Sequence, residues 1–263
     1  MGVNRGSHNL MWAVAVLLAT VLGAATMRGQ RGGPPQQPPS SSRAAAPVDL
    51  TGYWVSLVTE DWRYRMVTPL RGDYIGIPLN STGRKVADAW DPARDEATGE
   101  QCRAHGAGGI MRIPGRLHIT WQDEETIKLE TDAGMQTRAF AFRTPRTPSG
   151  GWQGVSVASW DRATSVMGAR GFFAAALPPG GSLKVVTTGM KPGYLRKNGV
   201  PYSASAVMTE YFDRLDLPNG DALLVVSTEL VDPAHLTQPF WTSTHFKKQS
   251  DASGWNPTPC SAR

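Results

Sequence analysis

Short segments in which apolar and polar residues alternate recur along this chain. Such segments, separated by Gly, Pro, Asn or Asp, are typical of half-buried β-strands. Turn sequences such as Asn219-Gly220 favour hairpins between them. About ten strands are predicted in this way, near residues 52–60, 62–68, 116–122, 126–131, 136–143, 154–160, 182–188, 207–215, 222–231 and 242–248.

Hairpin-linked strands leave exposed sheet edges, which closure into a barrel removes most fully. We therefore predict an all-β domain: an antiparallel closed or partly closed β-barrel of about 8–10 strands, with a two-sheet β-sandwich as the alternative. One short helix is predicted at 81–90, capped at residues 80–82 and ended by Pro92. The Gly- and Pro-rich stretch 191–202 is predicted to be a long exposed loop or, alternatively, a lid that holds an anionic group.

Two resemblances agree with this prediction. Gly52 and Trp54 form a Gly-x-Trp motif where the folded part begins, and this motif resembles the opening strand of lipocalin-like (calycin) β-barrels. The resemblance implies that Trp54 closes one end of the barrel. Residues 111–115, 130–134, 192–199 and 229–233 also resemble stretches of a group of secreted bacterial proteins. That resemblance implies export and a β fold, and it assigns no catalytic residue.

The first 48 residues differ in character from the rest. Residues 1–30 combine a positive charge at Arg5, an apolar run over 11–25 and small residues at 23–25, which predicts a signal peptide. An uncleaved N-terminal anchor is the alternative. Residues 31–48 are rich in Pro and Ser and are predicted to be a disordered linker, and 49–263 a single domain. We expect an exported protein, periplasmic or extracellular, without a stable membrane span after signal cleavage.

The net charge of +5 does not belong to the predicted domain. Four arginines precede Asp49, the first acidic residue, so residues 49–263 hold 23 basic and 22 acidic side chains. A basic surface for nucleic acid is therefore not indicated, and no nucleic-acid partner is expected.

The chain has two cysteines, Cys102 and Cys260. In an oxidising compartment a single pair is most simply a disulfide, which would tie the C-terminal tail to the body of the domain. A catalytic cysteine is the competing interpretation, but Cys260 lies in a Pro-flanked tail with no neighbouring base.

The first hypothesis for function is a lipocalin-like protein that binds a small hydrophobic or amphipathic molecule in a barrel cavity. Aromatic and charged residues together suit a pocket that is mostly apolar with a few orienting polar groups. Barrel core and an outer Glu–Arg ladder are the alternative interpretation of these residues. The predicted ligand-binding residues are Trp54, Glu60, Trp62, Tyr64, Arg65, His118, Trp121 and Arg138.

The second hypothesis is an exported enzyme on the same barrel. His118, Glu130 and Asp132 are its catalytic candidates, because a histidine beside a carboxylate can perform acid–base chemistry near neutral pH, and Arg138 could join their cluster. Ordinary cross-strand charge pairs would explain the same residues. The third hypothesis is a non-catalytic envelope interaction module. The histidines lack metal-ligand spacing and no cofactor fingerprint occurs, so no metal or cofactor is predicted.

Overall fold

A computed structural model describes residues 1, 40–143, 151–162 and 180–262. The predicted signal peptide, apart from Met1, and residues 31–39 of the predicted linker lie outside this part. Two compact units, Met1–Pro38 and Pro39–Arg263, divide the chain.

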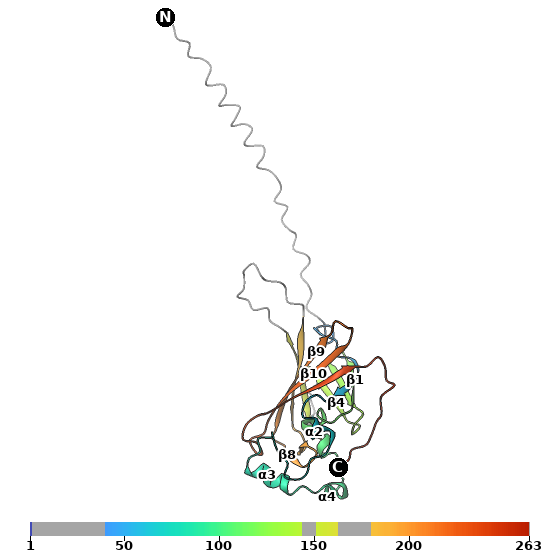
Figure 1. The fold of residues 1–263 in the computed structure, drawn as a ribbon. Helices are drawn as coiled ribbons and strands as arrows, with labels where there is room; N and C mark the ends of the chain where they lie inside the picture. The colour runs from blue at the N-terminus through green and yellow to red at the C-terminus, as the bar shows by residue number, and fades with distance from the viewer. Residues whose placement is uncertain (2–39, 144–150, 163–179, 263) are drawn as a thin grey trace. The chain divides into compact units, whose positions relative to one another are not determined.

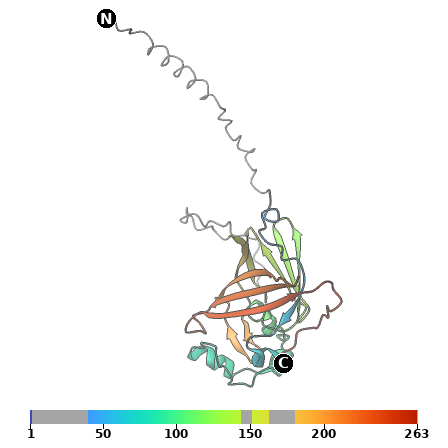
Figure 2. The ribbon, with the colours of Figure 1, turned by 45° about the horizontal axis from the view of Figure 1, so that its top comes forward.

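A closed β-barrel forms the body of the second unit (Figures 1 and 2). The described residues contribute nine strands to it, in the spatial order β1-β11-β10-β9-β6-β5-β4-β3-β2. The barrel strands are β1 (Gly52–Leu57), β2 (Arg116–Asp123), β3 (Thr126–Thr131), β4 (Thr137–Ala141), β5 (Val155–Arg162), β6 (Gly181–Thr188), β9 (Val207–Asp216), β10 (Ala222–Val231) and β11 (Phe240–Lys248). A closed barrel is thus confirmed over the sandwich, and it is compatible with a lipocalin-like barrel.

The predicted purely antiparallel arrangement is wrong at one place. β4 and β5 pair in parallel, with Phe140 opposite Ser156, whereas each other strand pair of the described barrel is antiparallel. The reason is that the number of strands in the barrel is odd. Strand directions cannot alternate all the way around a closed ring with an odd number of members, so a nine-stranded barrel requires a parallel neighbour pair.

Nine of the ten predicted strands are present with small shifts of their ends, but the strand predicted at 62–68 is wrong. Residues Trp62–Met66 form helix α2 instead. β1 ends at Leu57, the last residue paired with β11, so the chain beyond it has no strand partner. Asp61 then takes a left-handed conformation (φ 48°) and turns the chain into the helix.

The prediction of a single helix is also wrong. The other helices are α3 (Ser81–Asp88), α4 (Pro92–Ala97), the 3₁₀ helix η1 (Arg103–His105) and α5 (Ala107–Ile110). Asn80 caps α3 as predicted, since its side chain accepts a hydrogen bond from the Gly83 amide. Pro92 opens α4 at a first-turn position, where its missing N–H costs nothing, and Asp91 caps that helix.

The stretch 191–202 is a buried hairpin, not an exposed loop. β7 (Gly193–Arg196) and β8 (Val200–Tyr202) pair with each other, and each residue of both strands is buried. The helices and this hairpin gather at the lower end of the barrel in Figure 1. The hairpin is therefore a structural layer of that end of the domain.

Two apolar clusters hold the domain together. Inward-facing side chains of the barrel strands, such as Ile119, Leu129, Phe140 and Phe212, pack into the first. The second joins the barrel to the helical end and includes Tyr202. The inward positions alternate along the strands, which is the period-two pattern that predicted them.

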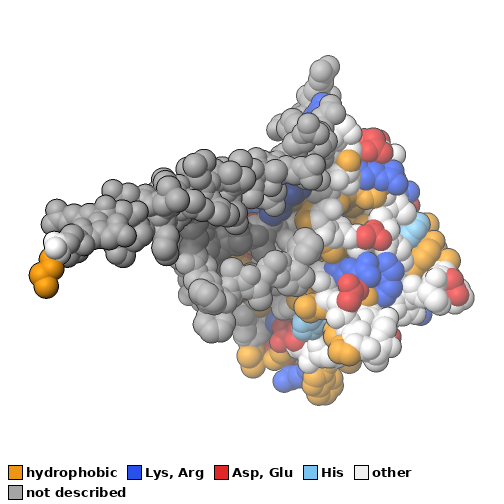
Figure 3. All heavy atoms as spheres, turned by 90° about the horizontal axis from the view of Figure 1, so that it is seen from above, with side chains coloured by type: hydrophobic (Ala, Val, Ile, Leu, Met, Phe, Trp, Pro, Cys, Tyr) orange, Lys and Arg blue, Asp and Glu red, His pale blue; other side chains and the backbone are white. Residues whose placement is uncertain are grey.

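The two ends of the domain are tied to its body. Cys102 and Cys260 form the predicted disulfide, which fits a non-cytoplasmic protein. Trp160 Nε1 donates to the carbonyl of Ser42 at 2.8 Å, within the predicted linker. Of the helices in the described part, none has the length and apolar character needed to cross a membrane. Seen from above, basic and acidic side chains are interspersed on the described surface (Figure 3).

Candidate functional site

An open groove of about 550 Å³ lies at the helical end of the barrel. This volume falls within the range of about 300–1,000 Å³ that is usual for small-molecule sites. Helices α3 and α4, the turn between them, the residues that lead into η1, and strand β7 supply its walls. The lining residues are Lys85, Val86, Ala89, Trp90, Asp91, Arg94, Asp95, Thr98, Glu100, Arg103 and Tyr194.

A partly buried hydrogen-bond network forms one part of this lining. The Tyr194 hydroxyl donates to Asp95 Oδ2 at 2.7 Å and accepts from Arg103 Nη1 at 3.1 Å. Arg103 also forms an ion pair with Asp95 at 3.3 Å. Burial raises the pKa of Tyr194 to about 12, so the hydroxyl keeps its proton. The network therefore presents polar groups in a fixed arrangement.

The apolar wall of the groove centres on Trp90, beside Val86 and Ala89. Gly199, in the turn between β7 and β8, holds this ring in place by close approach. A Cβ at Gly199 would lie 2.3 Å from Trp90 Cγ, so a side chain here would push the indole away. The Trp90 indole N–H is buried and has no acceptor among the described residues.

The charges at the groove are unevenly paired. Glu100 bonds Lys191 at 2.6 Å and Arg103 at 3.0 Å, so its charge is offset within the protein. Lys85 and Arg94 are exposed at the groove and take part in no ion pair with another described residue. The Asp91 carboxylate also forms no ion pair with a described residue, but it accepts hydrogen bonds from two backbone N–H groups at the start of α4. The groove therefore favours a molecule that combines an apolar part with a negative charge.

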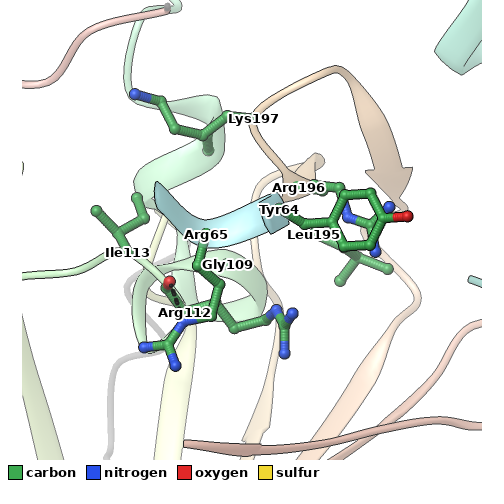
Figure 4. A pocket seen from close by; sticks show the side chains of 9 residues that line it. Tyr64, Arg65, Gly109, Arg112, Ile113, Leu195, Arg196 and Lys197 are labelled. Carbon is green, nitrogen blue, oxygen red and sulfur yellow. Dashed lines mark hydrogen bonds between the residues drawn. The ribbon is translucent and has the colours of Figure 1, made fainter. Parts of the chain in front are cut away.

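A second, much smaller recess lies against the same layer of β7 and η1. Its cavity of about 20 Å³ has room for roughly one water molecule. The lining residues are Tyr64, Arg65, Ala104, Gly109, Arg112, Ile113, Leu195, Arg196 and Lys197 (Figure 4). We call this recess the cationic crevice.

Carboxylates offset part of the positive charge of the cationic crevice. Arg112 pairs with Asp61 at 2.6 Å and Arg65 pairs with Glu60. Arg196 lies over the Tyr64 ring, 4.1 Å from its centroid. Burial lowers the pKa of Arg65 and of Arg196, and the charge of Arg112 adds to this. Lys197 points away from the guanidinium groups in Figure 4.

The structure separates the predicted ligand-binding residues. Tyr64 and Arg65 line the cationic crevice, and Glu60 lies beside Arg65. Trp62 is 66% exposed on α2. Trp54 is fully buried in the barrel core and donates from Nε1 to the Leu50 carbonyl at 2.9 Å.

Trp121 lies apart from these residues. Its ring stacks on Phe142, with centroids 5.8 Å apart, and packs against the barrel core. Trp54 and Trp121 therefore act as packing residues, and neither lines the groove or the cationic crevice.

His118 and Glu130 meet on the outer face of the barrel. His118 Nδ1 lies 3.2 Å from Glu130 Oε2, and the imidazole stacks on Tyr53 with ring centroids 4.1 Å apart. Lys128 pairs with the same carboxylate at 3.0 Å. Asp132 does not join them: it is buried and accepts from the backbone N–H groups of Arg116 and Ala133. None of these residues lines the groove or the crevice.

The predicted alignment of Arg138 with His118 and Glu130 is wrong. Arg138 lies opposite Leu129 on the inward face, whereas Glu130 faces outward. Inside the barrel Arg138 forms two hydrogen bonds with Glu210, at 3.0 and 2.5 Å, and a third with Thr187 at 3.2 Å. A one-residue change of position along a strand reverses the face, which explains the error.

No sequence pattern marks Trp90, Asp95 and Arg103 as residues of a binding site. They lie in short helices and turns, where no period-two pattern marks a face. One signal was available: the stretch 191–202 is predicted, as an alternative, to hold an anionic group, and residues of this hairpin line both recesses. Pro92 was the other signal, since a proline after an Asp also marks a helix start.

Among the described residues, no cluster of three or more His, Cys, Asp or Glu side chains is arranged to hold a metal ion. No family model, curated protein or solved structure matches this chain.

Proposed function

We propose that this protein is an exported small-molecule-binding protein of lipocalin-like type, and that its ligand is a small, partly apolar acid. The ligand site is the groove at the helical end, not the interior of the barrel. Large side chains such as Trp54, Phe140 and Phe212 occupy the interior in the described part of the chain. The groove, in contrast, has the volume of a small-molecule site.

One observation carries the proposal: a ligand-sized recess combines a fixed polar network with an apolar wall. The apolar part of the ligand lies against Trp90 and Val86. Its acidic group lies toward Arg94 and Lys85, whose charges are not offset by an ion pair with another described residue. The Tyr194–Asp95–Arg103 network orients the polar edge of the ligand.

Isothermal titration calorimetry with two probes tests this proposal. Indole-3-acetate and tryptamine share one ring system and carry opposite charges. We expect indole-3-acetate to bind saturably and tryptamine to bind at least about fivefold more weakly, because Lys85 and Arg94 form no ion pair with another described residue, whereas the Asp91 carboxylate is held by backbone N–H groups at the start of α4. Arg94→Gln should weaken indole-3-acetate binding by about two- to fivefold.

Arg43→Gln is the matched control, since Arg43 is also an exposed arginine but lies away from the groove and pairs with Glu124. It should leave both affinities unchanged. The proposal is overturned if neither probe gives saturable heat, or if tryptamine binds as tightly as indole-3-acetate.

The His118–Glu130 pair supports a second candidate function, acid–base catalysis on the outer face of the barrel. Its motivation is the contact of 3.2 Å between His118 Nδ1 and Glu130 Oε2 beside the Tyr53 ring. His118→Gln should then abolish a hydrolytic activity measured with p-nitrophenyl acetate. An unchanged rate, or no rate above buffer for the unmodified protein, would contradict this function.

A further inference from the structure

Residues 62–75, which follow β1, expose an unusual amount of apolar surface. We call them the docking segment. Among the described residues, seven large apolar side chains are at least 60% exposed, and five of them lie here. These five are Trp62 (66%), Met66 (60%), Val67 (66%), Leu70 (81%) and Ile75 (69%). Such a concentration marks an interaction surface, because scattered single exposures need no explanation but clusters do.

Buried polar side chains fix the backbone of this segment from behind. Asn198 Nδ2 donates to the carbonyls of Leu70 and Asp73, both at 3.0 Å. Arg196 Nη2 donates to the Ile75 carbonyl at 3.2 Å. These bonds hold the chain so that Leu70 and Ile75 stay outside the core.

The same arrangement turns α2 outward. Arg65, on its inner side, donates from Nε to the Arg112 carbonyl at 2.9 Å and from Nη2 to Ser56 Oγ at 3.0 Å. Trp62 and Met66, one helical turn apart, therefore face solvent together. Hydrogen bonds of the folded domain therefore keep the apolar side chains of this segment exposed.

Positive charge lies beside and behind these apolar side chains. Between Glu60 and Ile75 there are three arginines and three carboxylates, and the cationic crevice behind them adds Arg112, Arg196 and Lys197. The region thus carries a net charge of +3. Arg71 is exposed and forms no ion pair with another described residue.

We infer that the docking segment inserts its apolar side chains into the interface of a bilayer that contains anionic lipids. Side chains that protrude singly from a fixed backbone suit a fluid surface, which closes around each of them without a matching shape. Trp favours the headgroup region, and each nearby Lys or Arg adds attraction to an anionic leaflet. The groove takes no part in this contact. A failure of the membrane proposal would therefore leave the ligand-binding proposal unaffected, and the reverse also holds.

An environment-sensitive label tests the contact in the full chain. Nitrobenzoxadiazole is attached at Leu70→Cys or, as the matched control, at Trp241→Cys, an apolar position that is 58% exposed on β11. Mass spectrometry verifies that Cys102 and Cys260 remain paired. Each labelled protein is then mixed with phosphatidylcholine vesicles that contain or lack phosphatidylglycerol.

We expect the label at position 70 to shift to the blue and brighten only with phosphatidylglycerol vesicles, while the label at 241 stays unchanged. The double variant Arg63→Gln, Arg71→Gln should weaken this binding by about fivefold per charge removed.

Three results would overturn the inference. The first is an unchanged label at position 70 with anionic vesicles. The second is an equal response to vesicles without phosphatidylglycerol. The third is a shift without vesicles that grows with protein concentration, since it would assign the surface to a second copy of the chain or another protein.

Discussion

Inside the barrel, Arg138 and Glu210 form an ion pair in which both side chains are completely buried. Removing one partner leaves an uncompensated buried charge, whereas removing both leaves a space that apolar groups can fill. Glu210→Gln should therefore lower the free energy of unfolding by about 3–5 kcal/mol. The double variant Arg138→Met, Glu210→Leu should lie much closer to the unmodified protein in urea denaturation.

The exposed pair of Arg43 and Glu124 provides the comparison for this cycle, since it joins the same two types of side chain in water. Arg43→Gln should cost at most about 1 kcal/mol. Additive effects of the Arg138 and Glu210 changes would contradict a coupled buried pair.

Burial of His105 predicts a pH dependence of stability. Burial lowers its pKa from 6.5 to about 4, and the charge of Lys197 adds to the effect. The unfolded chain takes up a proton below about pH 6.5 and the folded chain only near pH 4, so stability falls as the pH falls through this window. The full loss amounts to about 3 kcal/mol.

Urea denaturation at a series of pH values between 7.5 and 4.5 measures this dependence. His105→Gln should flatten the decline, even if the variant is less stable at every pH. An identical slope in the unmodified protein and in His105→Gln would show that other groups cause it.

At the scale of elements, the turn between β7 and β8 positions the groove wall. Gly199 and Gly220 share a φ of 84°, but a Cβ at Gly199 would contact Trp90 while one at Gly220 would meet open space. Both Gly→Ala changes should lower the free energy of unfolding by about 1 kcal/mol, because a Cβ atom disfavours the left-handed backbone conformation. Gly199→Ala should cost at least about 1 kcal/mol more in thermal unfolding, because it also displaces Trp90. Equal costs would contradict this packing role.

The success of the strand predictions has a physical reason. Ile127 and Leu129 face the core while Lys128 and Glu130 face outward, so β3 was predicted with its observed bounds. Residues 62–68 also alternate, but alternation does not supply a partner strand. The helix there depends on distant contacts of Arg65, which no local pattern contains.

The candidate site was less predictable than the fold. Asp95, Arg103 and Tyr194 lie far apart in the chain, and the hydrogen bonds between them exist only in the folded domain. Arg138 was named from the sequence, but its partner Glu210 lies 72 residues away. The direction of a side chain and the identity of its partner are tertiary properties.

At the scale of the whole molecule, the disulfide links two points 158 residues apart, Cys102 and Cys260. In the chain-entropy model a loop of this length restricts the unfolded state by about 5 kcal/mol. Replacing both cysteines by serine should therefore lower the free energy of unfolding by several kcal/mol. Urea titrations compare the variant with the oxidised protein, and unchanged stability would contradict the role of the link.

The groove is proposed to bind a small, partly apolar acid. Titration of ¹⁵N-labelled protein with indole-3-acetate, followed at the indole N–H resonance of Trp90, measures this binding at the groove wall itself. The Trp90→Phe variant assigns that resonance. We expect a saturable shift in the unmodified protein and in Gly220→Ala, and a dissociation constant at least about tenfold higher in Gly199→Ala. An absent shift, or the same affinity in all three proteins, would contradict the claim.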